Sequence, residues 1–135
     1  MTPLTTNKAK EDAAIAWVME LERDNGRQPQ DTRYRGAPAD IESLPRLIEV
    51  KAFGTTTRGY DLPLEVRQIE EARRNPNFYL YVVENVSQGD PREFTLRVLG
   101  GARLQRLLER AKEYRGFYVP WPVADYDAGP LGLDG

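Results

Sequence analysis

Three charged residues near the middle of the chain could do chemistry together: Asp40, Glu49 and Lys51. Residues 46–52 have the composition of a strand, so Glu49 and Lys51, two positions apart, project from the same face. A turn at residues 43–45 predicts a hairpin that brings Asp40 beside them. Adjacent carboxylates repel unless a cation lies between them, and hard divalent cations prefer oxygen ligands. The pattern is typical of a metal site, although the spacing alone also fits a solvated surface with ion pairs.

The composition excludes several kinds of catalysis. The chain has 135 residues and contains neither histidine nor cysteine. Their absence excludes a histidine base, Ser-His and Cys-His nucleophile systems, and cysteine zinc sites. The remaining chemistry belongs to carboxylates, lysine, water and hard metals. A net charge of −2 gives no support for non-specific binding to polyanions.

The length suits one domain, which we place at residues 1–124, followed by a flexible tail over residues 125–135 that is rich in Gly and Asp. No run of 18 apolar residues predicts a membrane span, and the N-terminus lacks the apolar core of a signal peptide. We therefore expect no membrane association and a cytoplasmic location.

Hydrophobic patterning predicts an α/β fold with a mixed central β-sheet flanked by helices. Helices are expected over residues 8–23, capped by Asn7, over 63–75 with Pro63 in the first turn, and over 102–114. Strands are expected over residues 40–43, 46–52, 78–83 and 94–99. The uninterrupted apolar run at 78–83 is typical of a strand buried on both faces.

The spacing Asp-x8-Glu-x-Lys resembles the active-site motif of the PD-(D/E)XK nuclease superfamily, which has the restriction-endonuclease-like fold. Pro38 and Ala39 precede Asp40, whereas the superfamily motif has the proline directly before the aspartate. A closer similarity, to the protein-NO-VEIN C-terminal-like domain, covers most of residues 11–84. That family often has Gly-Tyr before the aspartate. The segments that carry the similarity are residues 18–23, 26–27, 30–31, 40–43, 46–51 and 75–83.

The resemblance implies metal-dependent hydrolysis of phosphodiester bonds in DNA, in defence or repair. Asp40 and Glu49 would hold Mg²⁺, with Mn²⁺ as a substitute, and the Val50 carbonyl would be a further ligand. Lys51 would orient the attacking water or stabilise negative charge as it develops. The resemblance also implies that Gln68, in the second helix, contacts water or phosphate; a structural role is the alternative.

First-helix carboxylates often complete the metal shell in this superfamily. Glu22 is the candidate ligand because helical phase places it on the face of Ile15 and Val18, where an unpaired carboxylate would be costly. Glu20 is the alternative.

The resemblance also bears on partners, because the family domain often occurs fused to helicases and other defence or DNA-processing modules. We expect a nucleic-acid partner, DNA foremost, and helicases or similar proteins as further partners. A homodimer is also expected, with the aromatic residues at 117–121 as a contact surface. The competing interpretation is a non-catalytic module that keeps the nuclease fold and binds nucleic acid or protein.

Overall fold

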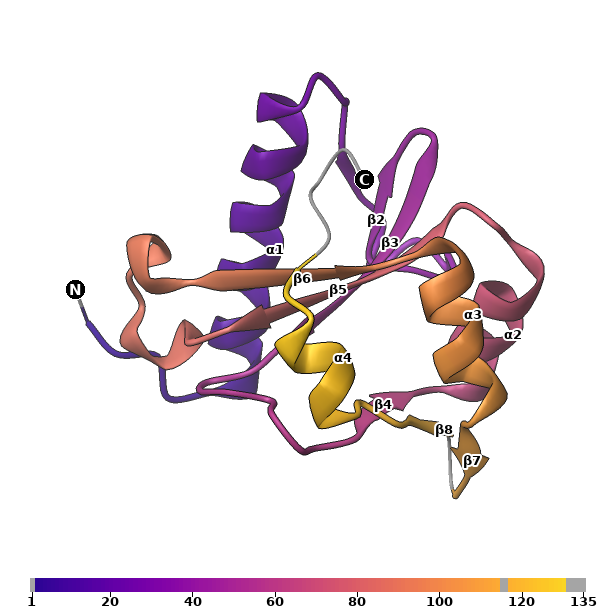
Figure 1. Cartoon of the computed structure of the whole chain (residues 1–135). Helices are drawn as coiled ribbons and strands as arrows, with labels where there is room; N and C mark the ends of the chain where they lie inside the picture. The colour runs from indigo at the N-terminus through magenta and orange to yellow at the C-terminus, as the bar shows by residue number, and fades with distance from the viewer. Residues whose placement is uncertain (1, 115–116, 131–135) are drawn as a thin grey trace.

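The computed structural model describes residues 2–114 and 117–130 and contains a larger and a smaller sheet (Figure 1). The larger sheet has the strand order β1-β2-β3-β5-β6, and the smaller has the order β4-β8-β7. The helices are α1 (Asn7–Asp24), α2 (Val66–Arg74), α3 (Gly101–Glu109) and α4 (Val123–Asp127). The strands are β1 (Gln30–Asp31), β2 (Ile41–Ser43), β3 (Arg46–Ala52), β4 (Leu62–Leu64), β5 (Phe78–Glu84), β6 (Thr95–Leu99), β7 (Lys112–Glu113) and β8 (Phe117–Val119).

The central sheet is mixed, as predicted. Strand β5 pairs in parallel with β3 and antiparallel with β6, while β2 pairs antiparallel with β3. Six of the seven residues of β5 are buried, which confirms that the apolar run beginning at Phe78 is a central strand. The hairpin of β2 and β3 is also confirmed, with Ser43 opposite Arg46 at its turn.

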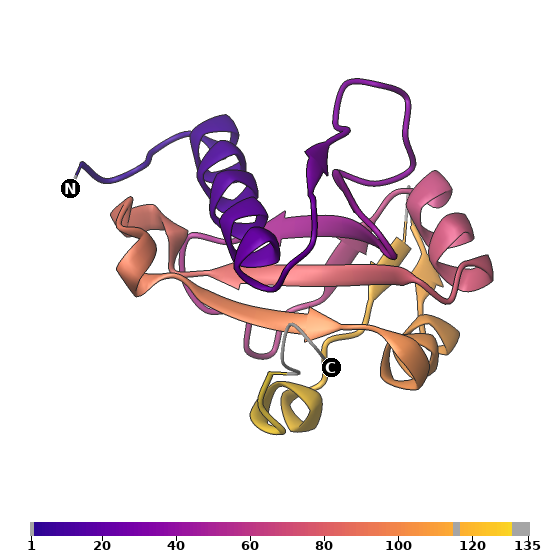
Figure 2. The ribbon, with the colours of Figure 1, turned by 90° about the horizontal axis from the view of Figure 1, so that it is seen from above.

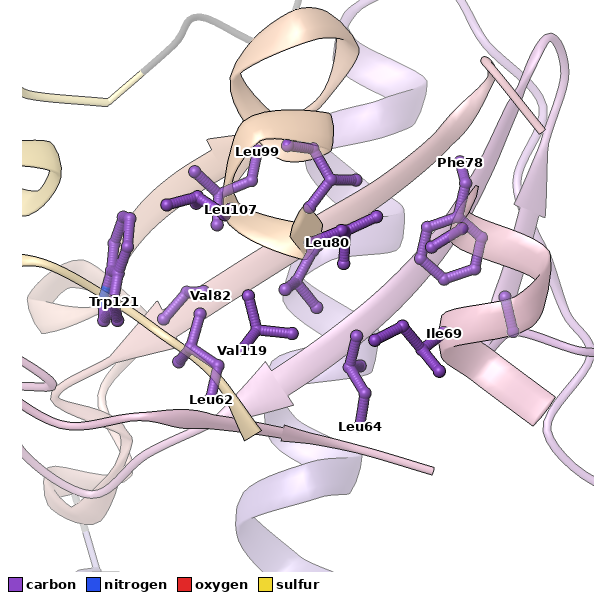
Figure 3. Packing of buried hydrophobic residues seen from close by; sticks show 14 residues of the cluster. Leu62, Leu64, Ile69, Phe78, Leu80, Val82, Leu99, Leu107, Val119 and Trp121 are labelled. Atoms are coloured by element: carbon purple, nitrogen blue, oxygen red, sulfur yellow. The ribbon is translucent and has the colours of Figure 1, made fainter. Parts of the chain in front are cut away.

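Different elements cover the two faces of this sheet. Ala14, Ile15 and Val18 of α1 pack with Ile48 and other residues on one face. On the other face, α2, α3 and strands β4 and β8 enclose a second cluster, in which Leu80 lies at the centre of the packing shown in Figure 3. Figure 2 shows α1 on one side of the central sheet and α3 and α4 on the other. Glu49 and Lys51 therefore lie on a strand, β3, whose sheet is covered on both faces.

Three predicted details of the helices are wrong. The helix expected over residues 102–114 ends at Glu109, and Lys112–Glu113 pair with β8 as strand β7. The N-cap of α1 is Thr6 and not Asn7, because the Thr6 Oγ1 accepts a hydrogen bond of 3.1 Å from the Ala9 N–H. Pro63 lies in strand β4 and not in a helix, since its neighbours Leu62 and Leu64 pair with β8 and are buried. Proline is tolerated there because β4 is an edge strand of the small sheet.

The predicted flexible tail needs correction at its beginning. Residues 125–127 belong to α4, and Arg58 binds Asp127 at 2.9 Å. Arg97 also lies 3.3 Å from the ring centroid of Tyr126 and donates a hydrogen bond of 2.7 Å to the Tyr126 carbonyl. These contacts order the first part of the segment, whereas residues 131–135 lie outside the described part of the chain.

Within residues 2–114 and 117–130, no helix combines the length and the apolar character that crossing a membrane requires.

Candidate active site

The backbone of the hairpin holds Asp40 against β3. Asp40 immediately precedes β2, and its N–H donates a hydrogen bond of 3.1 Å to the Ile48 carbonyl. Its side chain turns to the same strand, where the Oδ2 accepts a hydrogen bond of 2.9 Å from the Val50 N–H. One carboxylate is thereby fixed beside the strand that carries Glu49 and Lys51.

A pocket of about 380 Å³ brings most of the predicted site together. Five of the predicted residues line it: Asp40, Glu49, Val50, Lys51 and Gln68. The other lining residues come from the first turns of α1, from the end of β3 and from the start of α2: Asn7, Lys10, Glu11, Ala52 and Glu65. Three elements from different parts of the sequence therefore meet around the hairpin.

Glu49 has one satisfied and one unsatisfied oxygen. The residue is 3% exposed. Its Oε2 accepts a hydrogen bond of 2.8 Å from the Gln68 Nε2 and lies 3.3 Å from the Lys51 Nζ. The Oε1 is buried and has no hydrogen-bond partner among the described residues. A buried oxygen without a partner costs about 1–3 kcal/mol, and more when it is charged.

Burial also changes the protonation of the two carboxyl groups. Loss of hydration raises the pKa of Glu49 to about 8; the Lys51 ammonium opposes this rise, and the Asp40 carboxylate adds to it. The pKa of Asp40 is raised as well, mainly by burial and against the hydrogen bond from the Val50 N–H and the charge of Lys51. Near neutral pH, the metal-free site therefore favours a proton on Glu49.

Gln68 orients Glu49 and also belongs to the first turn of α2. Its Oε1 accepts a hydrogen bond of 3.0 Å from the N–H of Glu65, the N-cap residue. Its Nε2 is then directed at the Glu49 carboxylate. The structural role that the sequence left open is therefore present, together with a direct contact to Glu49, while a contact of Gln68 with water or phosphate stays a prediction.

Glu22 does not reach the pocket, so this prediction of a metal ligand is wrong. Both of its oxygens are already engaged: Oε1 lies 2.5 Å from the Arg27 Nε and 2.9 Å from the Ser43 Oγ, and Oε2 accepts from the Tyr81 hydroxyl at 2.9 Å. Burial alone would raise the pKa of Glu22, but these hydrogen bonds outweigh it and lower the pKa. Glu20, the alternative ligand, is exposed and does not line the pocket either.

The helix carboxylate at the pocket is Glu11, which the sequence reasoning missed. It lines the pocket, and its charge is one of the causes that raise the pKa of Asp40. Glu11 and Glu22 are about three helical turns apart and so share one stripe of α1. Helical phase therefore identified the correct stripe of α1, but it could not determine which helical turn along that stripe carries the pocket carboxylate. The docking of the hairpin decides between the two, because Ser43 at its turn contacts Glu22 and the open end of the hairpin therefore lies toward the other end of the helix.

The donor set fits a hard divalent cation in part. Among the residues that the structure describes, no group of three or more Asp or Glu side chains is arranged as a ready metal cluster. Asp40 and Glu49 do form a pair of oxygen donors, with Glu11 on the same pocket. The unpartnered Oε1 of Glu49 is an oxygen that a cation would satisfy.

Comparison with known proteins identifies the family of the chain. The family model described as Protein NO VEIN, C-terminal, matches residues 10–96, which include Glu11, the hairpin, α2 and β5. No curated protein and no solved structure matches the chain. The matched segment is more than half of the 135 residues. This chain therefore belongs to the family named for the C-terminal domain of protein NO VEIN.

Proposed function

We propose that the protein is a metal-dependent nuclease of the PD-(D/E)XK type, with Mg²⁺ as its cofactor and Mn²⁺ as a substitute. The observation that carries this proposal is the buried Glu49 Oε1, which has no partner among the described residues and shares a pocket with Asp40 and Lys51. A carboxylate left in this state is unfavourable unless it receives a proton or a cation. The pocket also supplies an ammonium group, which suits a phosphate substrate.

Each side chain then has a defined role. Asp40 and Glu49 would hold the cation, and Glu11 would add a third carboxylate from α1. When bound, the cation would activate a water molecule for attack on phosphorus and offset charge on the phosphate. Lys51 places a positive charge 3.3 Å from the Glu49 carboxylate, where it would also attract a phosphate oxygen. Gln68 keeps the Glu49 side chain oriented.

The substrate in this proposal is nucleic acid, with DNA foremost, and the setting is defence or repair. A helicase or another DNA-processing protein would deliver the substrate. The family resemblance described above supports this part of the proposal.

A cleavage assay tests the proposed activity. Labelled single- and double-stranded oligonucleotides of DNA and RNA are incubated with the protein in Mg²⁺, in Mn²⁺ or in EDTA. We expect cleavage only with a cation, and a loss of about 100-fold or more in Asp40→Asn and Lys51→Met. The matched control is Glu42→Gln, which removes an exposed carboxylate from β2 of the same hairpin and should leave cleavage unchanged.

Two outcomes would contradict the proposal. Cleavage that survives both Asp40→Asn and Lys51→Met would place the activity elsewhere. Cation-independent binding of oligonucleotides without any cleavage by the wild-type protein would instead favour the non-catalytic module.

A further inference from the structure

A second hollow, of about 300 Å³, adjoins the candidate active site. Lys51 and Glu65 line both hollows, so the two lie side by side at the end of β3 and share these side chains as a common wall. The wall of the second hollow is aromatic, and is made by Tyr114, Phe117 and Tyr118 of the segment around β7 and β8. Its volume lies at the lower end of the range for small-ligand pockets. It can therefore hold a group of about the size of one nucleobase.

The two tyrosines of this wall are exposed to solvent. Tyr114 is 72% exposed and Tyr118 is 44% exposed. Their ring centroids are 6.1 Å apart, and the ring planes meet at 44°. By contrast, the core aromatic residues Phe78 and Tyr81 are at most 1% exposed. The exposed pair therefore offers ring faces that the fold itself does not use.

Two positive charges lie close to the aromatic wall. Lys51 lines the hollow. The Arg73 guanidinium lies 5.1 Å from the ring centroid of Phe117, one of the wall residues. Arg73 is exposed and forms no ion pair with any residue in the described part of the chain. The phosphates of a nucleotide whose base is held in the hollow would find these positive charges nearby.

We propose that this hollow binds the base of an unpaired nucleotide next to the scissile phosphate, so that the enzyme acts on single-stranded nucleic acid. Both faces of a base inside a duplex are already stacked on its neighbours, whereas an unpaired base can stack on an aromatic side chain. The Tyr114–Tyr118 pair supplies such a surface, and Lys51, which lines both hollows, places it next to the site proposed for the reacting phosphate. This inference rests on the proposed nuclease function and names its substrate class.

The test compares alanine and phenylalanine at the same positions. In Tyr114→Ala and Tyr118→Ala the ring is lost, whereas Phe at either position keeps a stacking surface. We expect each alanine variant to lower kcat/KM on single-stranded oligonucleotides by about fivefold or more, and each phenylalanine variant to stay near wild type. The control is Tyr60→Ala, because Tyr60 is 65% exposed but lines neither hollow. Matched DNA and RNA single strands and duplexes show which nucleic acid is preferred.

Binding is measured separately, by fluorescence anisotropy of a labelled single strand in EDTA. Weaker binding by the alanine variants and wild-type binding by Tyr60→Ala support the inference. The inference would be overturned if the wild type cleaves and the alanine variants keep its kcat/KM on single strands and its preference between single strands and duplexes. That result would leave the nuclease proposal standing. A dimer that dissociates in the alanine variants, with single-strand cleavage unchanged, would also overturn it and assign the surface to a second copy of the chain. The absence of any cleavage by the wild type contradicts the nuclease proposal itself.

Discussion

Replacing Glu49 with glutamine should stabilise the metal-free protein near neutral pH. The wild-type carboxyl group is buried, and its Oε1 has no partner among the described residues. Glutamine keeps the oxygen that accepts from Gln68 and lies near Lys51. Its NH₂ group replaces the unpartnered oxygen and can donate to the nearby Asp40 carboxylate. The substitution therefore removes the free-energy cost of protonating this carboxyl group on folding at neutral pH, without removing the existing contacts.

The size of the effect follows from the pKa of Glu49, which is about 8 in the folded protein and about 4.3 in an unfolded chain. Because the folded value is the higher one, the stability that the protonated group contributes is complete below about pH 4.3 and is lost as the pH rises through 8. Each pH unit between these values corresponds to at most about 1.4 kcal/mol. The interval from about 4.3 to 7 sets an upper limit of about 3.7 kcal/mol, and we expect Glu49→Gln to gain about 1–3 kcal/mol at pH 7.

Urea denaturation in EDTA measures this free energy of unfolding at pH 4.5 and at pH 7. The gain should be present at pH 7 and nearly absent at pH 4.5. The matched control is Glu22→Gln, which removes the charge of a glutamate equally deep in the fold but paired with Arg27. Because the pKa of Glu22 is lowered, its stabilising effect is present at pH 7 and is lost toward acid pH. The control should therefore be destabilised at pH 7 by about 3 kcal/mol.

A Glu49→Gln variant less stable than the wild type at pH 7 would refute this reasoning. A difference between the two proteins that does not change with pH would refute it as well, because the effect would then not come from ionisation of the carboxyl group.

Other substitutions test the fold around the site, each by the same denaturation measurement. Thr6→Ala removes the N-cap of α1 and should cost about 1 kcal/mol, whereas Thr6→Ser should cost little. Trp121→Phe removes the hydrogen bond of 2.7 Å from the indole N–H to the Thr57 hydroxyl and should cost about 1–2 kcal/mol. Gly100→Ala would place its Cβ against the ring of Tyr79 and should cost about 1–3 kcal/mol. An unchanged stability in any of the three variants would contradict the corresponding contact.

The sequence predicted those parts of the site that depend on local geometry. The two-residue period of a strand placed Glu49 and Lys51 on one face, and both line the same pocket. The turn around Pro45 predicted the hairpin that brings Asp40 to β3. The apolar run at β5 predicted the strand beside it. In each case the relevant residues are close in the chain or follow a strict period.

Long-range packing decided what the sequence could not predict. Helical phase selected the inward stripe of α1, but Glu11 and Glu22 both lie on it, and only the docking of the hairpin distinguishes them. Pro63 entered a strand because β8, more than fifty residues later, pairs with β4. The same pairing creates the aromatic hollow beside Lys51. These features depend on contacts between distant segments, which no local pattern encodes.

Binding of Mn²⁺ tests the central claim most directly, because it examines the proposed cation site without assuming a substrate. The free Mn²⁺ signal in electron paramagnetic resonance is followed as protein is added to the ion at pH 7.5. We predict binding by the wild type in the millimolar range or tighter, its loss in Asp40→Asn and Glu49→Gln, and its retention in the folded Glu42→Gln control. Equal binding by the wild type and Asp40→Asn, or no binding by the wild type at millimolar Mn²⁺, would contradict the assignment.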